Sequence, residues 1–401
     1  MKKIINIALA LLMVAVMLPV MAMAEEPATA LPTADANGVI TLEKDVVLAD
    51  AVEINSDVTI DLHGWSITSS NGNSGKVIIA MANVTIKDSV GNGRIESTST
   101  SGGSSAAIRV GTAGTDKDIT VTIESGTMKG RDCGIFVAGI NSKLVVNGGY
   151  IEGTNGFGVS GNGSMKTGVP ECGPTTITIN GGKIIGGGTG IYHPQVGQLM
   201  INNGEITGKT GVEIRAGGLI VSGGTITATG DSTSTDPNGN GSTTVGAAIA
   251  VVQHTTKQPI NVKINGGSFN GVSALYEANP QINPEDATKQ VGIVVDGGTF
   301  NGDVNKDDVD ASKLLINGGT FTKKESGAEK YLANGKELDS NGKVVNTSIT
   351  IIVPGDGGNT TTTPSTDKTK NPGTGANDLV GVAAAMAVVS LLGAAAVIRK
   401  K

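Results

Sequence analysis

The stretch Ile177-Thr-Ile-Asn-Gly-Gly-Lys-Ile184 decides the fold, because the chain repeats its pattern seven more times. We call this pattern the NGG repeat: alternating apolar residues, an Asn-Gly-Gly-like turn, and another apolar residue two positions later. The other copies are Val121-Thr-Ile-Glu-Ser-Gly-Thr-Met128, Leu144-Val-Val-Asn-Gly-Gly-Tyr-Ile151, Leu199-Met-Ile-Asn-Asn-Gly-Glu-Ile206, Leu219-Ile-Val-Ser-Gly-Gly-Thr-Ile226, Val262-Lys-Ile-Asn-Gly-Gly-Ser-Phe269, Ile293-Val-Val-Asp-Gly-Gly-Thr-Phe300 and Leu314-Leu-Ile-Asn-Gly-Gly-Thr-Phe321. Such self-similarity predicts a solenoid in which each copy stacks on the next.

The spacing of the copies gives the coil length. Their fourth residues are Glu124, Asn147, Asn180, Asn202, Ser222, Asn265, Asp296 and Asn317, so the spacings are 23, 33, 22, 20, 43, 31 and 21 residues. We therefore expect a coil of about 20–23 residues, with loops inserted into the longer coils. The alternation of β-branched residues predicts strands, and a further strand before most copies, such as Gly190-Ile-Tyr192, predicts three strands per coil.

Stacking the coils in register places like residues above one another. One predicted inward column contains Ile123, Val146, Ile179, Ile201, Val221, Ile264, Val295 and Ile316. A second contains Met128, Ile151, Ile184, Ile206, Ile226, Phe269, Phe300 and Phe321. The asparagines at the corner are expected to form a ladder of side-chain amides.

This all-β body resembles the right-handed, pectate-lyase-like parallel β-helices of secreted bacterial proteins. We assign residues 25–37 to an N-terminal lead, 38–328 to the β-helix and 329–353 to a closing hairpin. The segments Val58–Ile67 and Val84–Asp88 fit irregular opening coils, as expected where a solenoid must be capped. An array of β-sandwiches is the alternative fold.

The composition of the chain argues against several classes of fold and function. The chain has 60 glycines but one Trp, four Tyr and five Phe, which argues against a conventional globular core. A net charge of −6 without a basic patch argues against nucleic acid as a partner. No phosphate-binding loop, zinc motif or serine triad is present in the sequence, so we expect no cofactor, no metal and no assigned catalytic residue.

The N-terminus predicts export. Lys2 and Lys3 precede an apolar stretch from Ile4 to Val20, and the small residues Ala22 and Ala24 frame a cleavage site. Residues 1–24 therefore fit a secretory signal peptide. An uncleaved membrane anchor is the alternative.

The C-terminus resembles the sorting signal of Gram-positive cell-wall proteins. Its motif is Asn371-Pro372-Gly373-Thr374-Gly375, followed by an apolar stretch at 379–398 and a basic end. The resemblance implies that a sortase cuts after Thr374 and joins it to peptidoglycan in the cell wall, although Asn371 replaces the usual Leu. Before sorting, the stretch 379–398 of the sorting signal (371–401) would span the membrane, while residues 354–370, rich in Thr, Pro and Gly, fit an extended linker. A plain membrane anchor is the alternative.

Aligning the strand before each NGG repeat produces an outward column, which we call the stripe. It contains Arg109, Phe136, Ser160, Tyr192, Glu213, Ala250 and Tyr276, and Arg215 lies two residues after Glu213. Exposed aromatic and charged residues together are typical of recognition sites, so Arg109, Phe136, Tyr192, Glu213, Arg215 and Tyr276 are candidate ligand-binding residues. The stripe would suit a host or dietary glycan and a role as an adhesin. Alternatively, the loops 162–175, 229–245 and 278–290 cover it.

Two other functions stay open. A polysaccharide lyase or glycoside hydrolase would need acids or a base beside the stripe, for which Asp132, Glu213, Glu277, His193, His254 and Arg215 are candidates. No matched pair of acids recurs in the repeats, and no catalytic residue of the pectate lyases can be aligned. A structural surface stalk is the other alternative.

Three further features have competing interpretations. Cys133 and Cys172 form either a disulfide or two separate thiols. The segment Asp303–Asp310 has alternating oxygen ligands but lacks the Gly and Glu of a calcium loop, so a solvated acidic loop is favoured. His63, near Trp65, is expected to pack in the first coil.

Overall fold

The computed structural model describes residues 26–69, 75–100, 105–236, 244–306 and 312–348. The chain divides into two units, Met1–Thr347 and Ser348–Lys401, and the fold described below is that of the first. The predicted signal peptide with Ala22 and Ala24, the linker, the sorting motif and the stretch 379–398 lie outside the described residues. Within the described part of the chain, no helix is long and apolar enough to cross a membrane.

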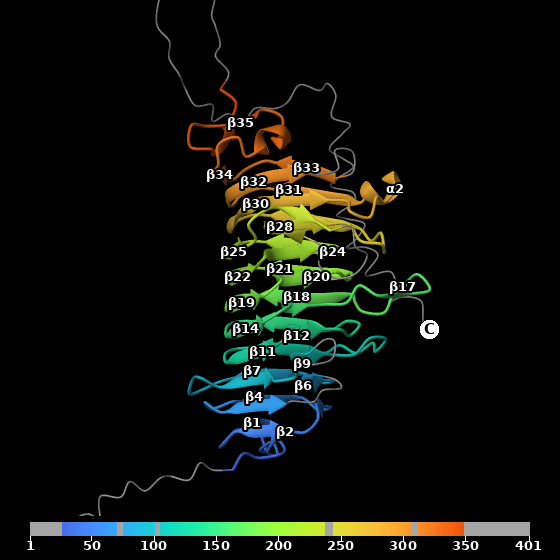
Figure 1. The fold of residues 1–401 in the computed structure, drawn as a ribbon, viewed down its shortest axis with the longest axis vertical. Coiled ribbons are helices and arrows are strands. Elements are labelled where there is room, and N and C mark those ends of the chain that lie inside the picture. The colour runs from blue at the N-terminus through green and yellow to red at the C-terminus, as the bar shows by residue number, and fades with distance from the viewer. Residues whose placement is uncertain (1–25, 70–74, 101–104, 237–243, 307–311, 349–401) are drawn as a thin grey trace, which may run out of the picture. The chain divides into compact units, whose positions relative to one another are not determined.

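The body is a stack of three-stranded coils, shown from β1 near the N-terminus to β34 in Figure 1. The first strands of the coils form an 11-stranded sheet. Its members are β1 (Val39–Thr41), β4 (Val58–Asp61), β7 (Val84–Lys87), β10 (Thr120–Ile123), β13 (Lys143–Val146), β18 (Thr175–Ile179), β21 (Gly197–Ile201), β24 (Gly217–Val221), β29 (Ile260–Ile264), β31 (Val291–Val295) and β33 (Ser312–Ile316).

The second and third strands belong to one 19-stranded sheet. Second strands are β2 (Val46–Leu48), β5 (Ser66–Ser69), β8 (Arg94–Ser97), β11 (Thr127–Gly130), β14 (Tyr150–Gly153), β19 (Lys183–Gly186), β22 (Glu205–Gly208), β25 (Thr225–Ala228) and β34 (Thr320–Phe321). Third strands are β3 (Val52–Ile54), β6 (Lys76–Ala80), β9 (Ala106–Val110), β12 (Cys133–Val137), β15 (Phe157–Ser160), β20 (Thr189–His193), β23 (Thr210–Ile214) and β28 (Ala247–Val252). In β30 (Ser268–Ala278) and β32 (Thr299–Lys306) the two strands are continuous.

Parallel pairing in register confirms the parallel β-helix and excludes the β-sandwich alternative. Every pairing between coils is parallel, and the shortest coils bring together residues 20 positions apart, such as Leu199 and Leu219. The long coil from Leu219 to Val262 accommodates an inserted loop. Three short strands per coil, predicted from the sequence, are confirmed.

Both predicted inward columns are confirmed. Residues from Ile123 to Ile316 pair coil by coil, as do residues from Met128 to Phe321. All belong to one buried core. Each buried side chain contributes about 1.5–3 kcal/mol to the free energy of unfolding. The stabilisation by the core therefore increases with every added coil.

The glycines of the NGG repeat permit the corner between the first and second strands. Gly149 and Gly182 have φ values of +82° and +83°, which disfavour any residue with a Cβ. A Cβ on Gly149 would also lie 2.7 Å from the carbonyl oxygen of Gly126 in the preceding coil. The corner therefore requires glycine for both conformation and space.

The predicted amide ladder is present in two runs. Asn147 Nδ2 donates to Glu124 Oε1 at 2.9 Å, Asn180 donates to Asn147 at 2.9 Å, and Asn202 donates to Asn180 at 2.8 Å. A shorter run joins Asn317 to Asp296 at 2.8 Å. Each run begins at a carboxylate, which only accepts hydrogen bonds and therefore fixes the direction of the amides.

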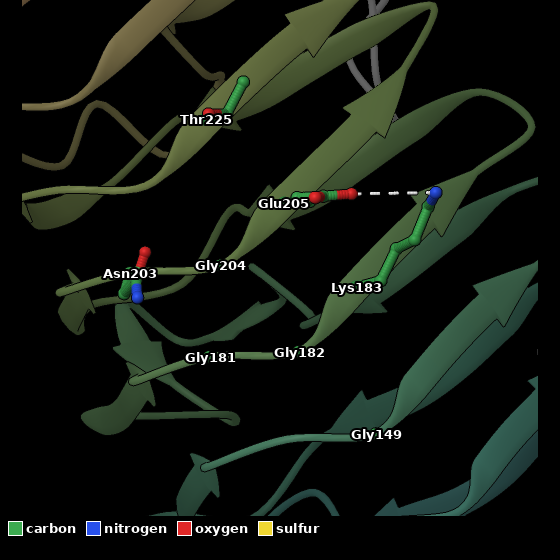
Figure 2. Close-up of a pocket in the computed structure, with 8 residues that line it drawn as sticks. All are labelled: Gly149, Gly181, Gly182, Lys183, Asn203, Gly204, Glu205 and Thr225. Atoms are coloured by element: carbon green, nitrogen blue, oxygen red, sulfur yellow. Dashed lines mark ion pairs between the residues drawn. The ribbon is translucent and has the colours of Figure 1, made fainter.

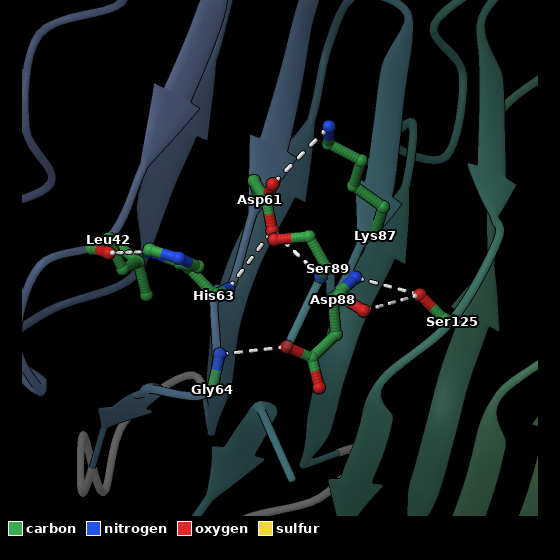
Figure 3. A network of polar contacts seen from close by, with 8 residues as sticks. All are labelled: Leu42, Asp61, His63, Gly64, Lys87, Asp88, Ser89 and Ser125. Carbon is green, nitrogen blue, oxygen red and sulfur yellow. Dashed lines mark hydrogen bonds and ion pairs between the residues drawn. The ribbon is translucent and has the colours of Figure 1, made fainter. Parts of the chain in front are cut away.

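The opening coils keep glycine at this corner, with Gly64 at φ +85°, and add aspartates that accept hydrogen bonds from the backbone. Figure 3 shows Asp61 Oδ1 accepting from the backbone N–H groups of His63 and Ser89, both at 3.0 Å, while Oδ2 lies 3.3 Å from Lys87 Nζ. Asp88 accepts from Gly64 N at 2.8 Å. Burial opposes ionisation of Asp61, but these hydrogen bonds and Lys87 outweigh it and lower the pKa of Asp61.

His63 lies at the edge of this network, where its Nδ1 is 3.3 Å from the Leu42 carbonyl oxygen, but its side chain is exposed, so the expectation that it packs in the first coil is wrong. Ser125 from the next coil completes the network, since its Oγ accepts from Asp88 N at 2.7 Å. Carboxylates thus link the irregular coils that the sequence predicted at this end.

Both ends of the stack are covered. At the N-terminal end, Ala28 forms a bridge with Val46 of β2. At the other end β35 (Lys336–Leu338) pairs antiparallel with β36 (Val344–Asn346), which confirms the predicted hairpin. Val344 N donates to Gly319 O at 2.9 Å, so the hairpin bonds to backbone groups of the last coil that would otherwise form an open edge.

Candidate functional site

The stripe has the predicted register. Arg109, Phe136, Ser160, Tyr192, Glu213, Ala250 and Tyr276 pair in that order along β9, β12, β15, β20, β23, β28 and β30. These side chains therefore lie on the outer side of the third strands, opposite the central core.

The sequence predicts that the stripe is exposed, and at its centre this prediction is wrong. Tyr192 is 5% exposed, and Glu213 and Arg215 are fully buried. Arg109, Phe136 and Tyr276 are half-buried. The alternative interpretation, in which inserted loops cover the stripe, describes the centre correctly.

Three inserted loops are the candidates for this cover. They contain β16 (Met165–Lys166) with β17 (Val169–Pro170), β26 (Ser234–Thr235) with β27 (Thr244–Val245), and α2 (Glu285–Thr288). Figure 1 shows β17 and α2 projecting on the same side.

The second of these loops bonds directly to the stripe. Thr244 N donates to Glu213 Oε2 at 3.3 Å, and Thr235 Oγ1 donates to Tyr276 Oη at 3.0 Å. Below it, Ala250 and Tyr276 pack together with Ala247 and Val252 in a small second core. The stripe thus supports packing where the sequence suggested recognition.

A buried ion pair lies at the centre of the stripe. Glu213 Oε1 is 3.9 Å from Arg215 Nε, and Arg215 Nη2 donates to the Gln253 carbonyl oxygen at 3.1 Å. Burial and the Glu213 carboxylate raise the pKa of Tyr192 to about 12, against the effect of Arg215. Tyr192 also stacks on Phe157 with 4.9 Å between ring centroids. This cluster is closed to solvent.

The candidate acids and bases do not assemble into an active site. Glu277 pairs in register with Val251, and His193 with Ile214, so both follow the inward column and not the stripe. Asp132 accepts from Ser105 N at 2.9 Å at a corner of another coil. The grouping of these residues on one side of the body with Glu213 is therefore wrong.

His193 makes the stability of the β-helix depend on pH. Burial lowers the pKa of His193 to about 4, with only partial compensation by the backbone of Gly197. The unfolded chain takes up this proton below pH 6.5 and the folded chain does not, so stability falls as the pH drops from 6.5 to 4. We expect the wild-type free energy of unfolding to fall by about 3 kcal/mol more than that of His193→Leu between pH 7.5 and 4.

Denaturant titrations at several pH values would measure this difference. His254→Gln, at a half-buried surface position, is the matched control and should keep the wild-type slope. Parallel pH profiles for wild type and His193→Leu would contradict a neutral, buried His193.

An open groove lies at the opposite corner of the coils, along the NGG repeats. It has a volume of about 530 Å³ and is lined by Gly149, Gly181, Gly182, Lys183, Asn203, Gly204, Glu205 and Thr225. Figure 2 shows the glycines as a bare backbone floor, with Lys183 and Glu205 beside it. Their charged groups are 3.6 Å apart and half or more of each side chain is exposed.

The groove is flanked by two regular columns. On one side Tyr150, Lys183, Glu205 and Thr225 pair in register. On the other side runs the ladder of Asn147, Asn180 and Asn202. An exposed ion pair and a hydroxyl therefore line the groove, while a half-buried aromatic ring continues their column by one coil and a row of amides precedes the glycines.

We did not predict this groove from the sequence, because the glycines were interpreted only as corner residues. The available signal was the position directly after each Gly-Gly, which changes from Tyr150 to Lys183, Glu205 and Thr225 while the surrounding repeat stays constant.

The structure contains two separate thiols and no bridge between them. Cys133 and Cys172 are both free and buried. Burial raises the pKa of Cys133 to about 12 and also raises that of Cys172. Neither is a thiolate at neutral pH, which argues against nucleophilic or metal-binding roles.

The acidic segment 303–310 is described only up to residue 306. Asp303 Oδ1 lies 2.6 Å from Lys323 Nζ, so this carboxylate already has a cationic partner. Among the residues that the structure describes, no group of three His, Cys, Asp or Glu side chains could hold a metal ion.

Comparison with known protein families found no family that matches this chain. Neither the curated proteins nor the solved structures contain a match. The function must therefore be argued from the sequence and from the surfaces of the β-helix.

Proposed function

We propose that this chain is a wall-anchored β-helix displayed on the cell surface, where it binds glycan chains along the groove beside the NGG repeats. The observation that carries the proposal is the groove itself, where the Lys183–Glu205 pair and Thr225 lie beside a glycine floor and Tyr150 precedes Lys183 by one coil in the same column. The ligand site that we propose is therefore at the corner of the coils and not on the covered stripe.

The chemistry of the groove suits a saccharide. Sugar rings present apolar C–H faces that can stack on Tyr150, and their hydroxyl groups can bond to amides, carboxylates and ammonium groups. The volume of about 530 Å³ is within the range of ligand sites, but the groove is open. An open channel along stacked coils favours a polymer over an enclosed small molecule.

The two ends of the sequence support the proposed location. The signal peptide at residues 1–24 would direct export, and a sortase would recognise and cleave the motif Asn371–Gly375. The linker 354–370 would hold the body away from the peptidoglycan. We take the coils as right-handed, because crossovers between parallel strands nearly always are.

Retention of the full-length chain by immobilised polysaccharides tests the proposal. Tyr150→Ala and the double variant Lys183→Ala/Glu205→Ala should each weaken retention by about tenfold, because stacking and charge-assisted hydrogen bonds are lost. The melting temperature should change little, since none of these side chains belongs to the buried core. Plant, mucin and bacterial polysaccharides form the panel, and the eluted polymers are checked for shortening.

The matched control is Lys143→Ala/Asp118→Ala, which removes another exposed ion pair, at 2.6 Å, away from the groove. It should retain polymer like wild type. Equal retention by the groove variants would exclude the groove as the site. Failure of every polymer to bind would favour a structural stalk, and shortened products would favour a polysaccharide-cleaving enzyme.

A further inference from the structure

Two cations occupy neighbouring coils near the N-terminal end of the stripe. Lys76 begins β6 and is 8% exposed, while Arg109 in β9 is half-buried. Lys76 pairs in register with Ala106, which is buried but outside the central core. Both cations therefore lie on the outer side of the third strands.

Neither cation forms an ion pair with another residue that the structure describes. Among the described residues, no carboxylate lies within 4.0 Å of Lys76 or Arg109, and neither side chain makes a hydrogen bond. The Nε of Arg109 is buried without a partner. The charge of Asp132 raises the pKa of Lys76. Asp132 already accepts a hydrogen bond from Ser105 N, however, and its Oδ1 lies 4.0 Å from Arg131 Nε.

Burial of unpaired cations is unfavourable. Burial lowers the pKa of Lys76 and of Arg109, and the charge of Arg109 lowers that of Lys76 further. Two like charges in adjacent coils, which Asp132 offsets only in part, produce a local positive potential. An oxyanion is the complement that would remove both the desolvation cost and the repulsion.

We propose that Lys76 and Arg109 form a binding site for a sulfate group, either free or as the ester of a sulfated polysaccharide. The Arg109 guanidinium carbon lies 6.0 Å from the centre of the Phe136 ring, so the ring positions the guanidinium. Arg109 supplies a planar pair of donors for two sulfate oxygens, and Lys76 supplies a point charge. The site involves the third strands and does not depend on glycan binding in the groove.

Thermal unfolding of the full-length chain in sodium sulfate, compared with sodium chloride at equal ionic strength, tests the site. Sulfate stabilises most proteins by exclusion from their surface, so the measured quantity is the difference between wild type and Lys76→Met/Arg109→Met. Wild type should gain about 2 °C more than the double variant at saturating sulfate. In chloride the double variant should melt at or above the wild-type temperature, because it lacks two buried unpaired charges.

Lys143→Met is the matched control, since it removes an exposed cation and should keep the full sulfate response. Arg109→Lys retains the charge without the planar donors and should lose part of the response. An equal sulfate shift in wild type and the double variant would overturn the proposal, as would the absence of any sulfate-specific shift.

A second arm distinguishes the source of the sulfate. Retention on dextran sulfate but not on dextran, lost in Lys76→Met/Arg109→Met, would assign a polysaccharide ester. A response to inorganic sulfate alone would assign the free anion. In both cases the groove variants should behave like wild type, so the two proposals can fail separately.

Discussion

Arg215→Ala is expected to lower the free energy of unfolding by about 3–5 kcal/mol, the largest effect of any charge removal in the described body. Arg215 and Glu213 are fully buried, with 3.9 Å between their charged atoms. Removing the guanidinium leaves the buried Glu213 carboxylate without its cationic neighbour, although the backbone N–H of Thr244 still donates to it at 3.3 Å. The remaining carboxylate must then be protonated or drawn toward solvent.

Chemical denaturation of wild type, Arg215→Ala and Glu213→Leu/Arg215→Met would measure this effect. The double variant replaces the pair by apolar side chains and should recover most of the lost stability, because desolvation of both charges is avoided. Glu205→Ala breaks the exposed pair with Lys183 and should cost less than about 1 kcal/mol. A loss as small as that for Arg215→Ala would mean that solvent reaches the pair.

The fold could be predicted because its determinants are local and repeated. Each NGG repeat carries a strand, a glycine corner and one apolar residue beyond it, so aligning the copies also aligns the core. Ile123 to Ile316 and Met128 to Phe321 therefore stack as expected. The amide ladder followed from the same alignment, since Asn147, Asn180 and Asn202 share one position.

The state of the stripe could not be predicted, because strand periodicity shows which side of a sheet a residue occupies but not what covers that side. Glu213 and Arg215 have the composition of a surface, yet a loop inserted after β25 closes over them through Thr244. Such a loop follows no repeat, so its path depends on tertiary contacts. The same reason explains why Arg109 could be predicted on the stripe but its buried neighbour Lys76 could not, since the burial of Lys76 also depends on tertiary contacts.

Phe300→Ala is expected to lower the free energy of unfolding by about 3–5 kcal/mol and to concentrate its damage in the last coils. Phe300 is fully buried between Phe269 and Phe321, with 4.7 Å from its ring centroid to each neighbour. Truncation removes both stacking contacts and opens a cavity inside the stack. Phe300→Leu keeps most of the apolar volume and should cost about 1–2 kcal/mol.

Hydrogen exchange distinguishes a local from a global effect. In a solenoid each coil contacts only its neighbours, so Phe300→Ala should reduce protection in β31 to β34 while β4 to β13 stay protected. Ile151→Ala removes the equivalent side chain of an earlier coil and should reduce protection around β11 to β19 instead. Uniform loss of protection in both variants would show that the coils unfold as one cooperative block, in which case the covered stripe and its buried ion pair would couple the coils more strongly than nearest-neighbour stacking alone.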